Sequence, residues 1–471
     1  MNIIEKKLEL KDTHQREFQP AKFADNYEYI LDSEGKKVEF DDPRIVYIEP
    51  HAINHYARRL TENFYNSRGR NIRFVENTTI EMFQYAKKIC SGRECVPTMV
   101  IAGAMLKDIY EKRGKDEISI YRLALEQEGP CQNGGWPALW EIFAKRLKIE
   151  NVIFSGTLYR SKNYMGLSLG ILLNQLLYYI LGHIITEARN ALQVVAENPR
   201  DALETFEKET DKFILKVKGR KKTLKRGLKA WAKEISTIPL KANVEETPKV
   251  LILGGLNLLF VHYPFEEYFL NSNIIPKVVD LTEPTYLVLY EFIMRFNFEK
   301  GRITSNNQIS MPALIKSLIL KNNKYNTLKA IFGRSAMIFF SSIIKKYRKI
   351  VGKTGLLFDE NISFKTLIED GREYFSRYAY NEVMTTVGRF IQSVKSDYYD
   401  GLINLGCFNC QPAMNSQAII RPLANKSEMP YAAIDCEGPW ISTNHLRLLE
   451  TIAVQAKRSR EKKNRIKNEI P

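Results

Sequence analysis

The feature that most constrains the fold of this chain is the alternation of short apolar runs with segments of helical periodicity. Four runs rich in Ile, Val, Phe and Tyr, residue types that favour strands, lie at 44–48, 71–75, 118–125 and 151–154. Between them, apolar residues recur at the three- and four-residue spacing of an amphipathic helix. Strands that alternate with such helices are typical of a parallel sheet with helices on both faces. The sequence therefore predicts an α/β fold.

Similar runs at 249–254, 275–280, 402–405 and 431–435 predict a second sheet, and 471 residues are too many for one hydrophobic core. We predict two Rossmann-like parallel-sheet domains around a cleft, with helical insertions. The predicted segments are an irregular N-terminal segment at 1–40, a first α/β domain with a long helical extension at 41–240, a second α/β domain at 248–455 with a helical insertion at 286–350, and a basic tail at 456–471.

The composition indicates a folded cytoplasmic protein. Apolar residues make up 44% of the chain and charged residues 26%, and six cysteines are too few for a disulfide scaffold of this length. The first residues lack the apolar core of a signal peptide. The longest apolar stretch, 165–181, contains Ser168, Asn174 and Gln175 and is barely long enough to span a bilayer, so we interpret it as a buried helix and expect no membrane association.

The formal net charge of +16 is concentrated in two basic runs, 216–229 and 457–467. Neither run has the interleaved aromatic residues of a single-strand nucleic-acid platform. We interpret them as a solvated helix face and a frayed terminus, and we expect no nucleic-acid partner. The alternative uses of these charges are an acidic partner protein, a phosphate-bearing ligand such as coenzyme A, and nucleic acid.

Three cysteines share one kind of position. Cys95, Cys131 and Cys410 each lie beside Gly or Pro at the start of a predicted helix, and Cys131 and Cys410 follow predicted strands. Ligands of parallel sheets gather at the carboxyl ends of the strands. The three thiols are therefore expected near one another.

Three convergent thiolates suit an iron–sulfur cluster, because iron and sulfide favour soft ligands. Helix amino termini beside them would stabilise the negative charge of such a cluster, and three ligands on a four-iron cube leave one iron open. The alternatives are three small buried cysteines, a zinc site, and a redox dithiol formed by Cys407 and Cys410. On the cluster hypothesis Cys90, Cys407 and Cys436 are dispensable.

The stretches Gly92-Arg-Glu-Cys95-Val-Pro, Gly129-Pro-Cys131 and Phe408-Asn-Cys410-Gln-Pro resemble, in order and spacing, the cysteine motifs of activase-related proteins of the 2-hydroxyacyl-CoA dehydratase family. The resemblance covers about residues 40–460. Its relatives include dehydratase subunits and double-cubane cluster proteins, which belong to anaerobic metabolism. The resemblance implies that Cys95, Cys131 and Cys410 hold a [4Fe-4S] or double-cubane cluster, and that the protein forms a homodimer.

The resemblance also implies a function in electron transfer. A separate ATP-dependent activator protein would supply low-potential electrons, and this chain would pass them to a difficult acceptor, an acyl-CoA or another small molecule. The sequence lacks a phosphate-binding glycine loop, so ATP hydrolysis is expected from the partner. The alternatives are a dehydratase-like subunit that binds the CoA thioester itself, and a scaffold of the same fold without a cluster.

Overall fold

The structure is a computed structural model of the full chain. The residues that it describes are 18–49, 54–75, 78–122, 132–155, 164–217, 221–255, 258–279, 324–358, 363–376 and 381–469, with isolated residues between 283 and 315.

The first domain contains a four-stranded parallel sheet, as predicted. Its strands, in chain order, are β4 (Ile45–Glu49), β5 (Asn71–Phe74), β6 (Ile118–Arg122) and β7 (Val152–Ser155). Their order in the sheet is β5-β4-β6-β7, and Tyr47 of β4 lies between Ile72 and Ile120 of its neighbours. All five residues of β6 are buried, because helices cover both faces of the sheet.

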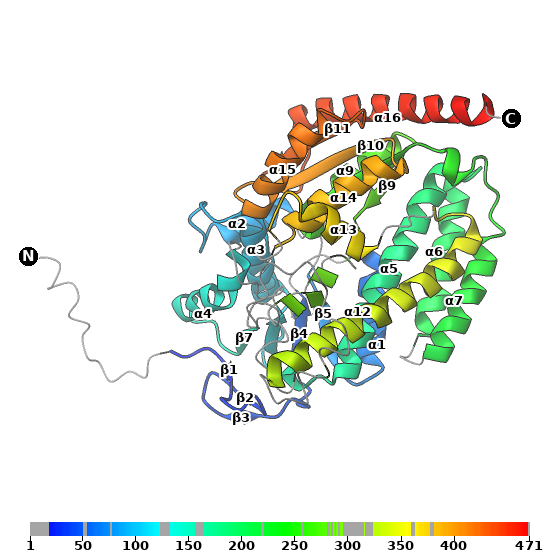
Figure 1. The fold of residues 1–471 in the computed structure, drawn as a ribbon. Helices are drawn as coiled ribbons and strands as arrows, with labels where there is room; N and C mark the ends of the chain where they lie inside the picture. Colours follow the sequence, from blue (N-terminus) through cyan, green and yellow to red (C-terminus); the bar gives the residue numbers. More distant parts are fainter. Residues whose placement is uncertain are drawn as a thin grey trace, which may run out of the picture.

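The second domain repeats this arrangement (Figure 1). Its strands are β8 (Lys249–Leu253), β9 (Ile275–Val278), β10 (Gly401–Cys407) and β11 (Tyr431–Cys436). They pair in parallel in the order β11-β10-β8-β9, so in each sheet the first and third strands of the chain lie at the centre. The prediction of two Rossmann-like parallel-sheet domains is confirmed. In such sheets the crevice for ligands lies beyond the carboxyl ends of these central strands.

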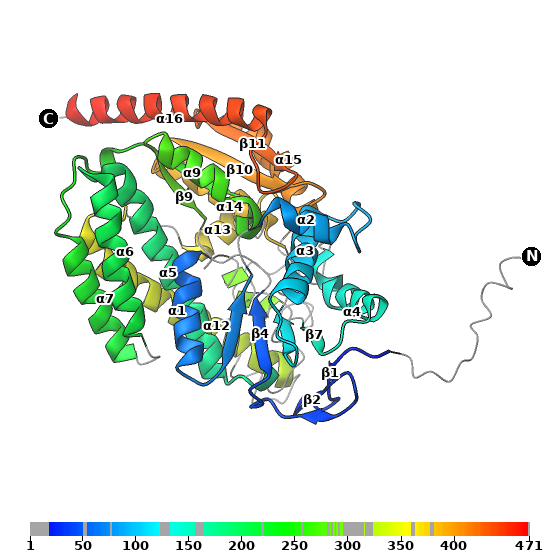
Figure 2. The same ribbon diagram turned by 180° about the vertical axis from the view of Figure 1, so that it is seen from behind.

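The helices of the first domain include a long extension, visible at one side of the molecule in Figures 1 and 2. They are α1 (His55–Asn66), α2 (Ile80–Ala86), α3 (Val96–Glu111), α4 (Trp136–Leu147), α5 (Leu169–Val195), α6 (Pro199–Leu215) and α7 (Lys221–Ile235), with short 3-10 turns η2 (Gln132–Gly135) and η3 (Tyr164–Gly166). The side chain of Asn198 caps α6, whose first residue, Pro199, suits that position. Most of the apolar stretch 165–181, predicted as a buried helix, lies in α5, which packs against α1, α6 and α12.

The helices of the second domain surround its sheet and extend back to α5. They are α8 (Leu258–Val261), α9 (Tyr263–Asn271), α12 (Lys324–Val351), α13 (Phe364–Gly371), α14 (Val383–Ser396), α15 (Gln411–Ala424) and α16 (Thr443–Glu469), with 3-10 turns η4 (Val244–Glu246) and η6 (Gly352–Thr354). Of the predicted insertion, α12 is described and most of 286–323 lies outside the described residues. Within the described chain, Thr327–Thr354 is the one helical segment long and apolar enough to cross a bilayer, a weak signal because core helices pass the same test.

The N-terminal segment is not wholly irregular, contrary to our expectation. Three two-residue strands, β1 (Lys22–Phe23), β2 (Ile30–Leu31) and β3 (Lys37–Val38), form a small antiparallel sheet. Strands of two residues are too short to show a period in the sequence, so the sequence pattern did not predict them. They are held by burial, since Ile30 and Val38 are fully or almost fully buried.

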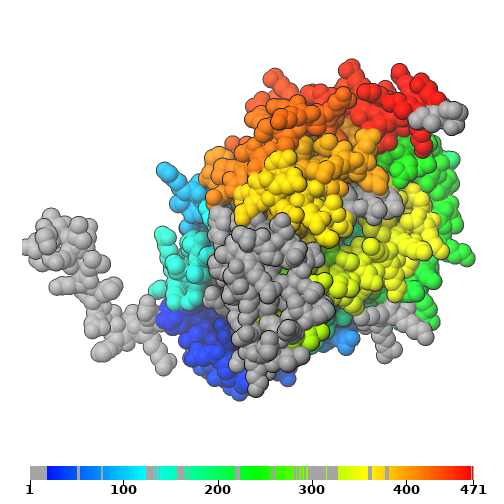
Figure 3. Space-filling view, in the orientation of Figure 1, coloured from blue at the N-terminus to red at the C-terminus, as the bar shows by residue number. Residues whose placement is uncertain are grey.

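Helix α16 lies along the outer surface of the second domain (Figures 1 and 3) and continues through the predicted basic tail to Glu469. Asp400, buried just before β10, holds it there. The Asp400 carboxylate accepts a hydrogen bond from Arg460 Nε at 2.9 Å and pairs with Lys463 Nζ at 3.1 Å. Two cations of the basic run 457–467 are therefore structural, whereas Arg458 and Lys462 remain exposed.

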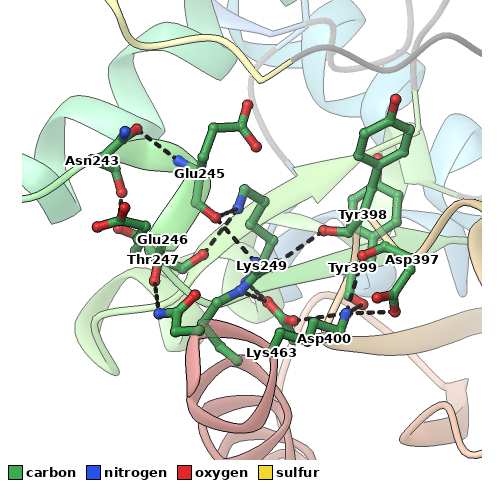
Figure 4. A network of polar contacts seen from close by, with 12 residues as sticks. Asn243, Glu245, Glu246, Thr247, Lys249, Asp397, Tyr398, Tyr399, Asp400 and Lys463 are labelled. Carbon is green, nitrogen blue, oxygen red and sulfur yellow. Dashed lines mark hydrogen bonds and ion pairs between the residues drawn. The ribbon is translucent and has the colours of Figure 1, made fainter. Parts of the chain in front are cut away.

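A buried lysine lies behind this contact (Figure 4). Lys249 at the start of β8 is 1% exposed, and its Nζ donates to the carbonyl oxygens of Glu245 at 3.1 Å and Thr247 at 3.0 Å. Burial, together with the nearby charge of Arg460, lowers the pKa of Lys249 to about 8. The two carbonyl oxygens satisfy two of the three ammonium protons.

The two domains are joined through a buried carboxylate. Glu187 of α5 pairs with Lys277 of β9 at 2.5 Å and with Arg348 of α12 at 2.8 Å, and the Glu187 and Lys277 side chains are each 2% exposed. Burial opposes ionisation of Glu187, but Arg348 and Lys277 outweigh it and hold its pKa well below the ordinary value. Apolar side chains of both domains form one contiguous core around this contact.

We expect Glu187→Gln to lower the free energy of unfolding by about 3–5 kcal/mol, because it leaves the buried Lys277 and the partly buried Arg348 without their carboxylate. Urea unfolding followed by circular dichroism measures this. The matched control is Glu141→Gln, which breaks the exposed pair of Glu141 with Lys145 and should cost less than about 1 kcal/mol. Equal losses for the two variants would contradict the structural role of Glu187.

Lys249 should make stability depend on alkaline pH. The unfolded chain keeps the Lys249 proton up to its ordinary pKa of 10.5, whereas the folded chain releases it near 8, so folding becomes more favourable as pH rises between these values. Relative to Lys249→Met, the free energy of unfolding of the native chain should increase by about 1–3 kcal/mol from pH 7.5 to 10.5. The exposed Lys229→Met is the control. Parallel pH curves for all three proteins would refute the assignment.

Candidate functional site

The first cysteine loop lies between α2 and α3 and ends at Cys95, the residue that precedes α3. The Glu94 carboxylate folds back onto this loop and accepts hydrogen bonds from the backbone N–H groups of Ser91 at 3.0 Å, Gly92 at 2.9 Å and Arg93 at 3.1 Å. Partial burial opposes its ionisation, but these donors lower the pKa of Glu94. Glu94 therefore fixes the shape of the loop and leaves Cys95 at the amino terminus of α3.

The second cysteine loop connects β10 to α15 and places Cys410 at the amino terminus of that helix. The Cys410 N–H donates to the Cys407 carbonyl oxygen at 3.0 Å, which closes a tight turn. Asn409 in this turn has a φ of 60°, a left-handed conformation that Asn adopts more readily than other side chains. Pro412 follows in the first turn of α15, where its missing N–H costs no helical hydrogen bond.

The two loops, 315 residues apart in sequence, contact each other directly. The Val96 N–H, the first donor of α3, bonds the Phe408 carbonyl oxygen at 3.2 Å, and Asn409 Nδ2 lies 3.5 Å from the Arg93 carbonyl oxygen. Beside them the ring of Phe83 on α2 packs edge-on against Trp440, with 5.5 Å between ring centres. The structure thus brings the amino termini of α3 and α15, which follow Cys95 and Cys410, together.

Cys131, the third predicted ligand, lies outside the described residues. The residue after it, Gln132, contacts the Cys95 loop. The Cys95 N–H donates to the side-chain oxygen of Gln132 at 3.3 Å. Further along, Trp136 at the start of α4 donates its indole N–H to Thr98 Oγ1 at 2.8 Å, and Thr98 Oγ1 lies 3.0 Å from Cys95 Sγ. Three helix starts from three cysteine motifs therefore meet around Cys95.

The thiols at this meeting point are buried. Cys95 is 6% exposed and Cys410 is 7% exposed. Burial raises the pKa of Cys95, although hydrogen bonding from Thr98 partly offsets this. Binding a metal there would therefore displace thiol protons.

The other cysteines lie close by. Cys407 and Cys436 are opposite each other in the register of β10 and β11, and both are buried. Burial, with smaller effects of Cys436, Cys410 and Cys95, raises the pKa of Cys407. Burial raises the pKa of Cys90, which is half-buried, to about 12. Burial therefore disfavours the thiolate form of these three cysteines, which is the form that a redox nucleophile needs.

Sequence reasoning found the three cysteine motifs but missed Thr98, Trp136 and Gln132. One signal was present: Thr98 stands three residues after the residue that precedes α3, the spacing at which side chains meet at a helix start. Trp136 gave no signal, because its partner lies 38 positions away. Within the described residues, no three His, Cys, Asp or Glu side chains converge as a metal site; two of the three predicted ligands belong to this part of the chain.

The fold and these loops define a class: a two-domain α/β protein in which buried cysteines meet at helix amino termini between two Rossmann-like sheets. No family model matches the sequence, and no curated protein matches it.

The left-handed residue before Cys410 gives a test of the second loop. Asn409→Val should destabilise the protein by about 1–2 kcal/mol more than Asn409→Gly, because a β-branched residue resists a φ of 60°. Both variants lose the same amide group, so their difference isolates the backbone conformation. Urea unfolding measures it, and equal stabilities would show that the turn adopts another conformation.

Proposed function

We propose that this protein is an iron–sulfur protein that receives low-potential electrons from a separate ATP-dependent activator and passes them to a difficult acceptor, an acyl-CoA or another small molecule. The observation that supports it most is the hydrogen bond between Val96 and Phe408, which joins the Cys95 and Cys410 loops from two domains. A structural role for either cysteine alone requires no such contact.

The donor set fits such a cofactor. Cys95 and Cys410 offer soft sulfur ligands, and each precedes a helix whose amino terminus carries partial positive charge. Their burial excludes water, which also favours retention of an acid-labile group. Cys131 would be the third ligand, and Gln132 next to it already contacts the Cys95 backbone.

When bound, the cluster would supply one-electron transfer at low potential and, with three protein ligands, an iron open to an acceptor. The chain itself would provide the ligands, the positive helix ends and a surface for the electron donor. That surface has exposed apolar side chains beside Cys410: Phe408 is 54% exposed and Met414 is 52% exposed. Contiguous exposed apolar patches mark protein–protein contacts, so we propose that these two side chains belong to the contact with the donor.

Iron and acid-labile sulfide per chain, measured after anaerobic purification and reconstitution, test the proposal. We expect about four irons for a single cube or about eight for a double cubane. Cys95→Ala, Cys131→Ala and Cys410→Ala should each lose most of the iron, whereas Cys90→Ala, Cys407→Ala and Cys436→Ala should keep it. Electron paramagnetic resonance of the dithionite-reduced protein distinguishes the two cluster types.

Two outcomes would overturn the proposal. Full iron in all three ligand variants would refute the ligand assignment. Zinc alone, or no metal, in the native chain would leave a scaffold with buried thiols. A separate thermal-shift measurement with acyl-CoA tests whether the thioester binds, because a ligand of the folded state raises the melting temperature of the protein.

A further inference from the structure

A chain of two hydrogen bonds ends at the Cys95 sulfur. It runs from Trp136 Nε1 on α4 to Thr98 Oγ1 on α3, at 2.8 Å, and from Thr98 Oγ1 to Cys95 Sγ, at 3.0 Å. All three residues are at least nine-tenths buried: Trp136 is 5%, Thr98 is 1% and Cys95 is 6% exposed. Water therefore does not compete for these groups.

The direction of the chain follows from the chemistry of its members. An indole N–H only donates, so Thr98 Oγ1 accepts from Trp136. A sulfur bonded to iron carries no proton and only accepts. The single hydroxyl proton of Thr98 is then directed to the sulfur of Cys95.

We infer that Thr98, oriented by Trp136, is a positioning residue that donates a hydrogen bond to the Cys95 sulfur and thereby raises the reduction potential of the group that Cys95 holds. This inference rests on the proposed function. Reduction adds negative charge that spreads onto the ligand sulfurs, and a donor to a sulfur stabilises this charge. The same chain couples α4, which follows the Cys131 loop, to Cys95.

The test compares Thr98→Val, which keeps the shape and removes the hydroxyl, with Thr98→Ser, which keeps the hydroxyl. After anaerobic reconstitution, iron and sulfide are measured first, and the midpoint potential is then found by redox titration. At a fixed solution potential, the ratio of reduced to oxidised protein should fall about three- to tenfold in Thr98→Val, where tenfold corresponds to about 59 mV for one electron. Thr98→Ser should match the native chain.

Trp136→Phe is a second variant that leaves Thr98 and the ring packing in place. It should shift the potential in the same negative direction but less, because the hydroxyl is no longer oriented. If Thr98→Val folds but loses iron, the potentials of Trp136→Phe and Thr98→Ser decide the question. If Thr98→Val holds full iron, a potential equal to that of the native chain would overturn the inference. If Thr98→Val holds no iron, a native potential in Trp136→Phe would overturn it. Either result would leave the proposed function standing. A native chain without iron would overturn the proposed function, and the inference with it.

Discussion

The arrangement of this molecule depends on the buried carboxylate of Glu187, which lies against Lys277 of the second sheet and Arg348 of α12. A charge at 2% exposure is costly without its partners, so this contact favours the observed relative position of α5, β9 and α12. Because α5 belongs to the first domain and β9 to the second, the same contact fixes the two sheets relative to each other. The cysteine loops, which come from both domains, meet in that position.

Where the loops meet, backbone N–H groups at helix starts donate hydrogen bonds to residues of other elements. The first N–H of α3 bonds the Phe408 carbonyl oxygen of the other domain, and the Cys95 N–H bonds Gln132. These donors have no partner inside their own helix, so each is available for a contact that joins two motifs. The result is a buried site with positive helix ends, soft sulfur donors and a threonine hydroxyl next to one sulfur. Soft sulfur donors beside positive helix ends are the features on which the proposed metal–sulfur group rests.

The repeated strand order explains why two cysteine motifs occupy equivalent positions. In each domain the third strand, β6 or β10, lies at the centre of the sheet, and a cysteine motif follows it. The sequence made this visible through the apolar runs and through Cys131 and Cys410, each before a helix. It did not reveal the partners of those motifs, because hydrogen bonds between residues far apart, such as Trp136 with Thr98, leave no period or spacing. The sequence did not predict the small N-terminal sheet for the same reason, because its strands of two residues depend on burial against the first domain.

The sequence by itself determined the α/β class, the two parallel sheets and the positions of Cys95 and Cys410 at helix starts, because these follow from local apolar periodicity and from Gly and Pro at turns. The tertiary structure decided which motifs meet and which charges are structural. Arg460 and Lys463 of the basic run pair with the buried Asp400 and so hold α16 against the second domain. Lys277 and Arg348 pair with Glu187 and so join β9 and α12 to α5. The effect of a buried charge on stability depends on the groups next to it, and only the folded chain decides which groups those are.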